Sequence, residues 1–504
     1  MEKLQSYNHT LSKVITKICK EGGVASYSHI LTSKNRFFPP LFDLLVSGDF
    51  SYQPQRLKTL TQFIRFFAIT KLRILSSVLK RRKKVNLYLS QIQQSSKIVY
   101  LFKSFRMGNK AFSKESDPFF GPLIELLAEK NIESIFYIEN LDGGILSTNK
   151  DEEQFLEVMD FLGFQDLIWI LKESLFSFFK GGSVGELDDP LFLSKEQDFR
   201  GMLKWEYLKP SALNSLAYYR SQKNLLKKIK IDKYIYPYEN NCWERMALLA
   251  MKELTGVRTI GYQHNVVPLS SLNMFPLENE MSVTPQPQKI LTTGAYTRDL
   301  LGRHSGFPKE SIQESCALRY MYLHKSKKLE RNKNKIVLVA LEGVEQITEI
   351  IERIHEVKNE RQGIRYLFRF HPVLPFEQVS NKLSFDLEKV KDFEVSRGKS
   401  VYEDLERAGL ILYWGSTLGL ESVKIGRPVI NVNLKGASFD PLFELGSFKR
   451  SWNIEENTLE QNINEIFSLT DEFFDEEYQV ASDFIDSYFY PVNRTNLQPF
   501  IEEL

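Results

Sequence analysis

The chain has no long apolar run and no paired cysteines. Nowhere in its 504 residues is there a stretch of the roughly 18 uncharged apolar residues that a membrane-spanning helix needs. Its start, Met1-Glu-Lys-Leu-Gln, is not a basic segment followed by an apolar one, so no secretory signal peptide is expected. The cysteines, Cys19, Cys242 and Cys316, lie far apart without a CxxC pair. They argue against a zinc ribbon or disulfide scaffold and fit a reducing cytoplasm.

Motifs that bind metals or cofactors are also missing. There is no HxxxH, HExxH or Asp-x-Asp spacing, so the sequence predicts no metal site. GxGxxG and Walker-type loops are absent as well, which excludes the common dinucleotide and P-loop fingerprints. We therefore expect no cofactor and no metal, and a phosphorylated ligand would be held by protein groups alone.

What is present is the composition of a large globular protein. The chain is 42% hydrophobic and 26% charged, with a formal net charge of only +2. Two or three domains with an ample core are expected, and the total charge predicts no partner. The charge is unevenly spread, however. From Phe50 to Phe112 there is no Asp or Glu, but there are many Lys and Arg.

Residues 1–89 form a basic, aromatic-rich leader that we expect to be helical. Within it, Leu57–Leu79 has the apolar spacing of a helix with interspersed cations and leads into the basic run 80–84. Such a helix can lie on an anionic leaflet, where each cation near the surface contributes about 1 kcal/mol. It can equally pack on the domain and leave a solvated basic tail. An anionic membrane surface, reached through residues 50–112, is therefore one expected partner, and nucleic acid is not.

Alternating strands and helices predict an α/β fold with two Rossmann-like domains facing a cleft. The first domain spans residues 90–270 and carries a helical insertion at about 152–230, where we expect no strand. The second domain spans residues 271–504, and the Pro-rich loop from His264 to Gln288 is the best inter-domain linker. The strands expected in the second domain cover residues 335–340, 365–370, 410–413 and 428–432.

Two patches in the second domain predict a phosphate site. Arg369 and His371 end one strand, before Pro372, while Gly415, Ser416 and Thr417 follow another. Turns that follow parallel strands meet at the carboxyl edge of the sheet, where ligands bind. An imidazole and a Gly-Ser-Thr turn that opens a helix can both donate hydrogen bonds to an anion. The alternatives are a structural histidine under a loop and an ordinary helix N-cap.

Acidic residues beside these patches have other expected roles. Glu421 lies in the helix after Thr417 and can accept from ribose hydroxyls, or merely complement the helix N-terminus. Glu342 and Gly343 end another strand of the second domain. A carboxylate would repel a phosphate, so Glu342 is expected to contact a base or a sugar.

The first domain offers three candidate general bases. Glu239 and His264 each end a strand, and Asp117 lies in the loop after the first strand. At the carboxyl edge of a sheet, either Glu239 or His264 can take a proton from a hydroxyl nucleophile. The alternatives are a helix N-terminal acid for Glu239 and a surface or salt-bridged acid for Glu244.

The pattern Arg-x-His-Pro, then Gly-Ser-Thr-x-Gly-x-Glu and Gly-x-Pro-Val-Ile, resembles glycosyltransferases of the GT-B architecture over roughly Lys233 to Val432. Within these, the chain is similar to bacterial surface-carbohydrate proteins, notably sialyltransferases and Kdo transferases that use CMP-activated ulosonic acids. In those groups a His-Pro motif and a Ser/Thr motif hold the CMP phosphate, which implies His371, Ser416 and Thr417 here. The base of those enzymes comes from a motif of two acids and a glycine in the first domain. The similar segment here, Leu341-Glu342-Gly343, contains one acid and lies in the second domain, so Glu342 is not expected to be the base.

CDP-glycerol-dependent polymerases share the His-Pro and Ser patches. They also carry a His-Gly after a strand of the first domain, which resembles Gln263-His264-Asn265, with Asn265 in place of Gly. This resemblance implies His264 as the base of a sugar-phosphate or polyol-phosphate transfer.

The sequence therefore predicts a nucleotide-sugar-dependent, metal-independent glycosyltransferase. Its expected donor is a CMP-ulosonic acid, its acceptor a surface glycan or lipid-linked hydroxyl, and its location the cytoplasmic face of the plasma membrane. The alternatives are a CDP-polyol or sugar-phosphate transferase, a sugar-nucleotide epimerase of the same architecture, and a non-catalytic glycan-assembly protein.

Overall fold

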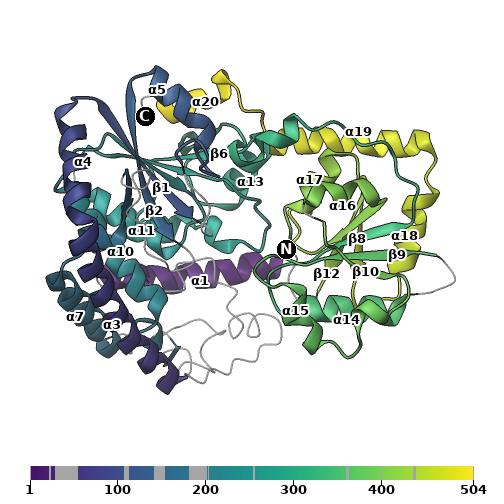
Figure 1. Ribbon diagram of the computed structural model, residues 1–504, viewed down its shortest axis with the longest axis horizontal. Helices are drawn as coiled ribbons and strands as arrows, with labels where there is room; N and C mark the ends of the chain where they lie inside the picture. The colour runs from purple at the N-terminus through teal and green to yellow at the C-terminus, as the bar shows by residue number, and fades with distance from the viewer. Residues whose placement is uncertain are drawn as a thin grey trace. The chain divides into compact units, whose positions relative to one another are not determined.

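The computed structural model divides the chain into two compact units, which are coloured along the chain in Figure 1. The first unit comprises Met1–His264, Leu272–Arg319 and Pro491–Leu504, and the second comprises Asn265–Ser271 and Tyr320–Tyr490. The residues that the structure describes are 2–21, 24–28, 55–106, 113–140, 154–180, 201–202, 204–253, 256–358, 363–398, 400–434 and 439–502.

The first unit is built on a sheet in which all paired strands are parallel. Its strand order is β3-β2-β1-β4-β5-β6-β7, which is the Rossmann order with one further strand. The switch point, where the order of the strands reverses, lies between β1 and β4. The strands are β1 (Ile98–Arg106), β2 (Ile132–Asn140), β3 (Phe155–Glu157), β4 (Lys233–Pro237), β5 (Arg258–Tyr262), β6 (Lys289–Thr292) and β7 (Ile312–Glu314).

The second unit repeats the same design with one strand fewer. Its parallel sheet has the order β10-β9-β8-β11-β12-β13, so that the switch point lies between β8 and β11. The strands are β8 (Ile336–Ala340), β9 (Arg365–Arg369), β10 (Phe393–Val395), β11 (Leu410–Tyr413), β12 (Val429–Asn433) and β13 (Lys449–Asn453). The predicted α/β fold with two Rossmann-like domains is confirmed by these two sheets.

Helices cover the sheets because each has one apolar face. In α14 the isoleucines 347, 350, 351 and 354 are all buried against the second sheet, at the spacing of one helix face. The principal helices are α1 (Glu2–Glu21), α3 (Arg56–Lys80), α4 (Arg82–Gln94), α5 (Ile124–Glu129), α6 (Val158–Phe161), α7 (Phe164–Lys180), α10 (Pro210–Leu226), α11 (Cys242–Lys252), α12 (Glu278–Met281), α13 (Ala295–His304), α14 (Ile347–Val357), α15 (Phe376–Val379), α16 (Val401–Arg407), α17 (Leu418–Lys424), α18 (Leu459–Ser468), α19 (Asp471–Tyr488) and α20 (Arg494–Ile501).

The predicted domain boundary at 270/271 is corrected by the sheet order. Strands β6 and β7 add to the first sheet, so the first unit continues to Arg319. The chain also returns to this unit after Tyr490. The Pro-rich loop expected as a linker is divided between the units: Asn265–Ser271 belongs to the second, and the part from Leu272 onward belongs to the first. There Asn8 Nδ2 on α1 donates to the Phe275 carbonyl at 3.0 Å.

The helical insertion expected at 152–230 contains one strand. Phe155–Glu157 forms β3, which pairs with β2 at Phe136–Ile138. The rest of the described insertion is helical, in α6, α7 and α10, while residues 181–200 lie outside the described residues. Three residues at the edge of a sheet give too short a pattern to distinguish from the helix that follows.

The basic leader is helical where the structure describes it and packs on the first unit. The predicted helix Leu57–Leu79 is confirmed as α3, and α4 continues past the expected end at residue 89. Phe63, Phe66 and Ile74 of α3 join a core cluster with residues of α7 and α10. Arg81 is buried and pairs with Asp160, its Nη2 lying 3.3 Å from Oδ2. Residues 29–54 of the leader lie outside the described residues.

Candidate functional site

The predicted phosphate-site residues gather at the carboxyl edge of the second sheet, around its switch point. Glu342 and Gly343 follow β8, and Gly415 and Ser416 follow β11, the strand paired with β8. The Glu342 carboxylate accepts a hydrogen bond from the Gly415 backbone N–H. The two strand ends on either side of the switch point are therefore joined directly.

Glu342 and Trp414 leave unsatisfied polar atoms at these strand ends. Glu342 Oε1 and Trp414 Nε1 are buried and have no hydrogen-bond partner among the described residues. Burial also raises the pKa of the Glu342 carboxyl, against the lowering effect of the Gly415 N–H. An unpaired buried polar group costs about 1–3 kcal/mol, so it requires an explanation such as a ligand. The chemistry of a carboxyl fits a sugar hydroxyl or the polar edge of a base better than it fits a phosphate.

His371 is held in one tautomer beside Gly343. The Val373 N–H donates to His371 Nδ1 at 3.1 Å, so in the neutral ring the proton is on Nε2. Partial burial lowers the pKa of His371, which favours the neutral form. A Cβ at Gly343 would lie 3.0 Å from Nδ1 and 3.3 Å from Val373 Cβ. The glycine therefore leaves room for the ring, which presents Nε2–H as a donor on an exposed side chain.

Arg369 does not join this group. Its Nη1 lies 2.6 Å from Asp404 Oδ2 and 3.3 Å from the Ser400 carbonyl, both at α16. The sequence placed Arg369 and His371 together at the end of one strand, but β9 ends at Arg369. Alternation of side chains stops there, and the guanidinium stabilises the helix instead.

The Gly-Ser-Thr turn is a tight connection into α17. A Cβ at Gly415 would lie 2.9 Å from Phe439 Cβ, so only glycine fits without displacing Phe439. Ser416 Oγ accepts from the Leu418 N–H at 3.2 Å, and Thr417 Oγ1 donates to Glu421 Oε1 at 3.2 Å. The Ser416 hydroxyl proton remains available as a donor, whereas Thr417 and Glu421 are engaged with each other.

Asp117, one of the three candidate bases, is a structural residue of its loop. Its Oδ1 accepts from the N–H groups of Phe119 at 2.9 Å and Phe120 at 2.7 Å, and its Oδ2 accepts from Ser104 Oγ. Burial raises its pKa to about 6. Both carboxylate oxygens accept hydrogen bonds that stabilise the turn after β1, so we do not retain Asp117 as a base.

Glu239 and His264 come together at the carboxyl edge of the first sheet. His264 Nε2 lies 3.8 Å from Glu239 Oε1, and their side chains are 7% and 22% exposed. The His264 ring also packs edge-on against Phe119, with centroids 4.8 Å apart. This is a carboxylate–imidazole pair on neighbouring strands, next to the Asp117 loop.

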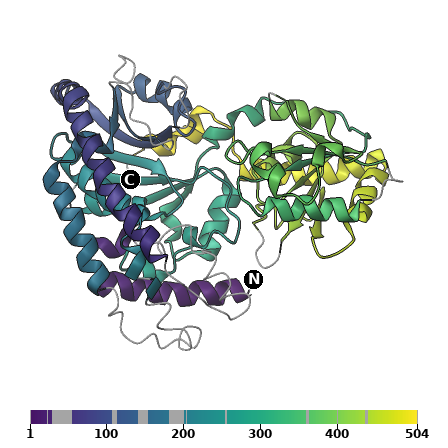
Figure 2. The same ribbon diagram turned by 60° about the horizontal axis from the view of Figure 1, so that its bottom comes forward.

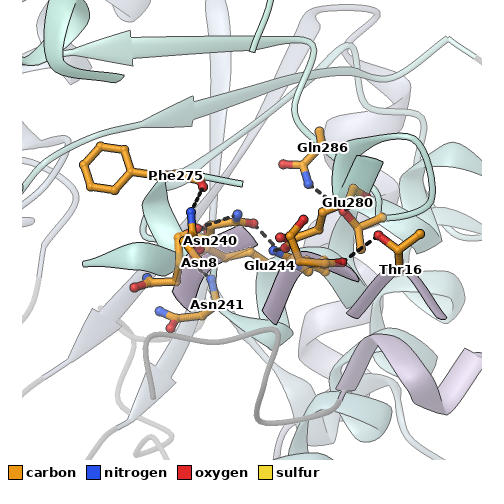
Figure 3. A network of polar contacts seen from close by, with 12 residues as sticks. Asn8, Thr16, Asn240, Asn241, Glu244, Phe275, Glu280 and Gln286 are labelled. Carbon is orange, nitrogen blue, oxygen red and sulfur yellow. Dashed lines mark hydrogen bonds and ion pairs between the residues drawn. The ribbon is translucent and has the colours of Figure 1, made fainter. Parts of the chain in front are cut away.

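The sequence did not reveal what holds Glu239 in place. The Glu239 N–H donates to the buried Glu244 carboxylate at 3.1 Å, and Asn273 Nδ2 donates to the Glu239 carbonyl. Asn240 Nδ2 donates in turn to the Asn273 carbonyl at 2.7 Å. Figure 3 shows part of this network, with Asn240, Asn241 and Glu244 near Asn8 of α1, which donates to the Phe275 carbonyl. Glu244, expected to be a surface or salt-bridged acid, is instead the acid of a capping box with Asn241, and the Asn-x-x-Glu spacing carries that signal.

Lys103 is a second residue that sequence reasoning missed. It is fully buried on β1, with Nζ 3.0 Å from Glu139 Oε2 and 3.8 Å from the Phe105 ring centroid. Burial lowers its pKa, and Glu139 opposes that effect. The sequence did carry a signal for this buried lysine, because Lys103 lies between the apolar run Val99–Phe102 and Phe105. Among the described residues, no cluster of His, Cys, Asp and Glu could hold a metal ion.

Comparisons with known proteins identify no family. No family model and no curated protein matches the chain. It is similar to the UDP-GlcNAc 2-epimerase of Neisseria meningitidis bound to UDP-GlcNAc, with 14% identity and a TM-score of 0.44 over 80% of this chain and 98% of that one. S. aureus MnaA with UDP gives 12% and 0.44 over 80% and 95%. A glycosyltransferase of Rickettsia africae gives 12% and 0.44 over 81% and 97%. These values assign neither a substrate nor a reaction.

Proposed function

We propose that this chain is a nucleotide-sugar-dependent glycosyltransferase that holds its donor at the switch point of the second sheet. The observation that carries the proposal is the set of polar groups that meet there. His371 presents an Nε2–H donor, and Glu342 Oε1 and Trp414 Nε1 are buried without partners among the described residues. Open parallel sheets bind their ligands at this position.

The chemistry follows from which groups are donors. A neutral imidazole donor and the Ser416 hydroxyl can hydrogen-bond the donor phosphate as charge develops on the leaving group. Glu342 is better suited to a sugar hydroxyl or a base edge than to the phosphate, because a carboxylate would repel an anion. We propose a CMP-activated ulosonic acid as the donor, on the resemblance of the His-Pro and Ser-Thr patches, and no metal in the transfer step.

The proposed acceptor chemistry lies at the first sheet. The Glu239–His264 pair can take the proton of an acceptor hydroxyl, with one group accepting it and the other stabilising the resulting charge. Glu239→Gln and His264→Asn are each expected to lower kcat by about 10²–10⁴-fold with little change in KM. A matched control is Glu310→Gln, which changes an exposed acid. Wild-type turnover in both variants would remove this pair as the base.

A nucleotide panel tests the donor site. Thermal unfolding is measured with CMP, CDP, UDP, GDP and ADP, with and without magnesium. A ligand at one hundred times its Kd stabilises by about 2.7 kcal/mol, so CMP should raise the Tm without metal. His371→Ala should weaken CMP binding at least tenfold, whereas His355→Ala, whose ring stacks on Phe385, should not.

Each other outcome of the panel has a definite meaning. A preference for UDP would keep the site but replace the donor class, and would favour a UDP-sugar transferase or the epimerase alternative. A response to CDP above CMP would favour polyol-phosphate transfer. No response to any nucleotide would overturn the assignment of the switch point as a donor site.

The proposed acceptor is a surface glycan or a lipid-linked hydroxyl, and the proposed place of action is the cytoplasmic face of a membrane. These follow from the resemblance to surface-carbohydrate enzymes.

A further inference from the structure

Helix α3 has two apolar faces, and only one of them is used in folding. Phe63, Phe66 and Ile74, with Thr59, Thr70 and Ser77, are buried. This face contacts α6, α7 and α10 of the same unit. In Figures 1 and 2, α3 and α7 run side by side along the outside of the first unit.

The opposite face is an exposed apolar stripe. Leu57 is 80% exposed, Ile64 68%, Leu72 66% and Leu79 81%. Together with Leu60, Ala68 and Leu75, which are also exposed, they recur every three or four residues, so they share one side of the helix. Burial of this apolar surface away from water would be favourable, but these side chains remain exposed in the structure. We call these positions the α3 stripe.

The neighbouring helix α7 adds to the exposed apolar surface. Phe164, Ile168, Phe176 and Phe179 are between 47% and 74% exposed and also follow a helical spacing. Aromatic side chains of this kind are typical of helices that enter the headgroup region of a bilayer.

Cations without acids flank the α3 stripe. On a helix of about 100° per residue, Lys58 and Arg65 lie on one side of the stripe and Arg56 on the other, while Lys71 lies within it. All are exposed, and α3 and α4 contain no Asp or Glu. The described structure shows no salt bridge for these four cations, unlike Arg81, which pairs with Asp160. An exposed apolar stripe with cations beside and within it is complementary to an anionic lipid surface.

We propose that the α3 stripe and its flanking cations dock the protein on an anionic lipid bilayer, with α3 lying in the plane of the headgroups. No helix within the described residues is long and apolar enough to cross a membrane. Residues 50–54 and 107–112, part of the segment expected to meet the membrane, lie outside the described residues. The inference deepens the proposed function, because it supplies the contact with a lipid-linked acceptor. It stands in the first unit, whereas the donor site stands in the second, so the two can fail separately.

Vesicle co-sedimentation of the full chain, without nucleotide, tests the docking surface. The wild type is expected to bind phosphatidylglycerol-containing vesicles at least tenfold more tightly than pure phosphatidylcholine vesicles, and to release as salt is raised. Leu57→Ser/Ile64→Ser/Leu79→Ser should weaken this binding at least tenfold. Lys58→Gln/Arg65→Gln/Lys71→Gln should weaken it roughly fivefold per cation, and should flatten the salt dependence.

The matched control is Phe473→Ser/Val480→Ser on the acidic helix α19, where both side chains are more than half exposed. It should bind vesicles like the wild type. All these changes are at exposed positions, so an unchanged Tm confirms that each variant is folded. Equal binding to neutral and anionic vesicles, or wild-type binding by the stripe variant, would overturn the proposal. A dimer that the stripe variant converts to a monomer, with vesicle binding unchanged, would assign the stripe to a second copy of this chain instead.

Discussion

At the scale of single residues, Gly343 tests whether the His371 ring is placed for a ligand. A methyl group at Gly343 would lie 3.0 Å from His371 Nδ1 and 3.3 Å from Val373 Cβ, so Gly343→Ala must displace the imidazole or its loop. We expect CMP to bind about tenfold more weakly, with less than about 1 kcal/mol lost in stability, since the ring is exposed. The affinity is measured by calorimetry.

The control is Gly446→Ala in the same unit, where an added Cβ meets nothing within 4 Å. It should leave affinity unchanged. If both glycine variants bind CMP like the wild type, the ring position does not matter for the ligand and His371 loses its role.

Asp117 gives a pH prediction that follows from burial. Its pKa is raised to about 6 in the folded chain against an ordinary value of 3.8. A raised carboxyl pKa contributes stability that is fully present below pH 4 and is lost as pH rises through about 6. Relative to Asp117→Asn, which keeps the Oδ1 acceptor for Phe119 and Phe120, the wild type should lose up to about 3 kcal/mol between pH 4 and 6. Denaturant unfolding of both proteins across that range measures it, and a constant difference would contradict it.

The positions of site residues could be predicted from the sequence where the residues directly follow a strand. His371, Ser416, Glu342 and Gly343 lie at the expected sheet edge because parallel strands end on one side. Arg369 was not predictable in this way, because its direction depends on where β9 stops and on Asp404, which is 35 residues away. The orphaned atoms of Glu342 and Trp414 depend on burial by the whole unit, which no local pattern encodes.

At the scale of elements, the start of α11 is stabilised by one buried acid. The Glu244 carboxylate accepts from the N–H groups of Glu239, Asn240 and Asn241, at 2.9–3.2 Å. Glu244→Ala leaves these donors unpaired in a buried turn, so we expect a loss of about 2–4 kcal/mol in the free energy of unfolding. Because Glu239 is held by the same carboxylate, kcat should fall as well.

The matched change is Glu403→Ala, an exposed acid in the first turn of α16. It should cost less than about 1 kcal/mol, since it removes only a charge near a helix N-terminus. Equal Tm values for the two variants would show that the Glu244 cap does not stabilise α11.

Elements with a strong period were predictable, and short ones were not. The helix expected at Leu57–Leu79 agrees with α3 to within one residue at each end, because its buried and exposed faces both follow the helical period. The strand β3 has three residues and pairs only at its β2 side, so its identity depends on tertiary contact. The pattern in α3 did not show what its apolar faces contact, because the spacing of apolar residues is the same whether a domain or a lipid covers them.

At the scale of the whole molecule, the chain order differs from the order in space. The last segment, Pro491–Leu504, returns to the first unit after the second unit is complete. There Lys233 Nζ, buried on β4, donates to the Phe500 carbonyl at 3.0 Å and to the Glu502 carbonyl at 2.6 Å. The sequence analysis assigned this tail to the second domain, which precedes it in the chain, because no local pattern shows that the chain goes back to the first unit.

This return makes the C-terminus part of the stability of the first unit. Phe500 on α20 is fully buried, and its ring packs edge-on against Tyr262 of β5 with centroids 5.4 Å apart. Phe500→Ala is expected to cost about 3–5 kcal/mol, as removal of a buried aromatic ring leaves a cavity. Hydrogen exchange should show faster exchange in β4 and β5 but not in β8 and β11, because those strands belong to the other unit. Phe473→Ala, which truncates a 59% exposed ring, should change neither sheet. Loss of protection in both sheets after Phe500→Ala would mean that the two units unfold together, and no loss in either would mean that α20 is dispensable.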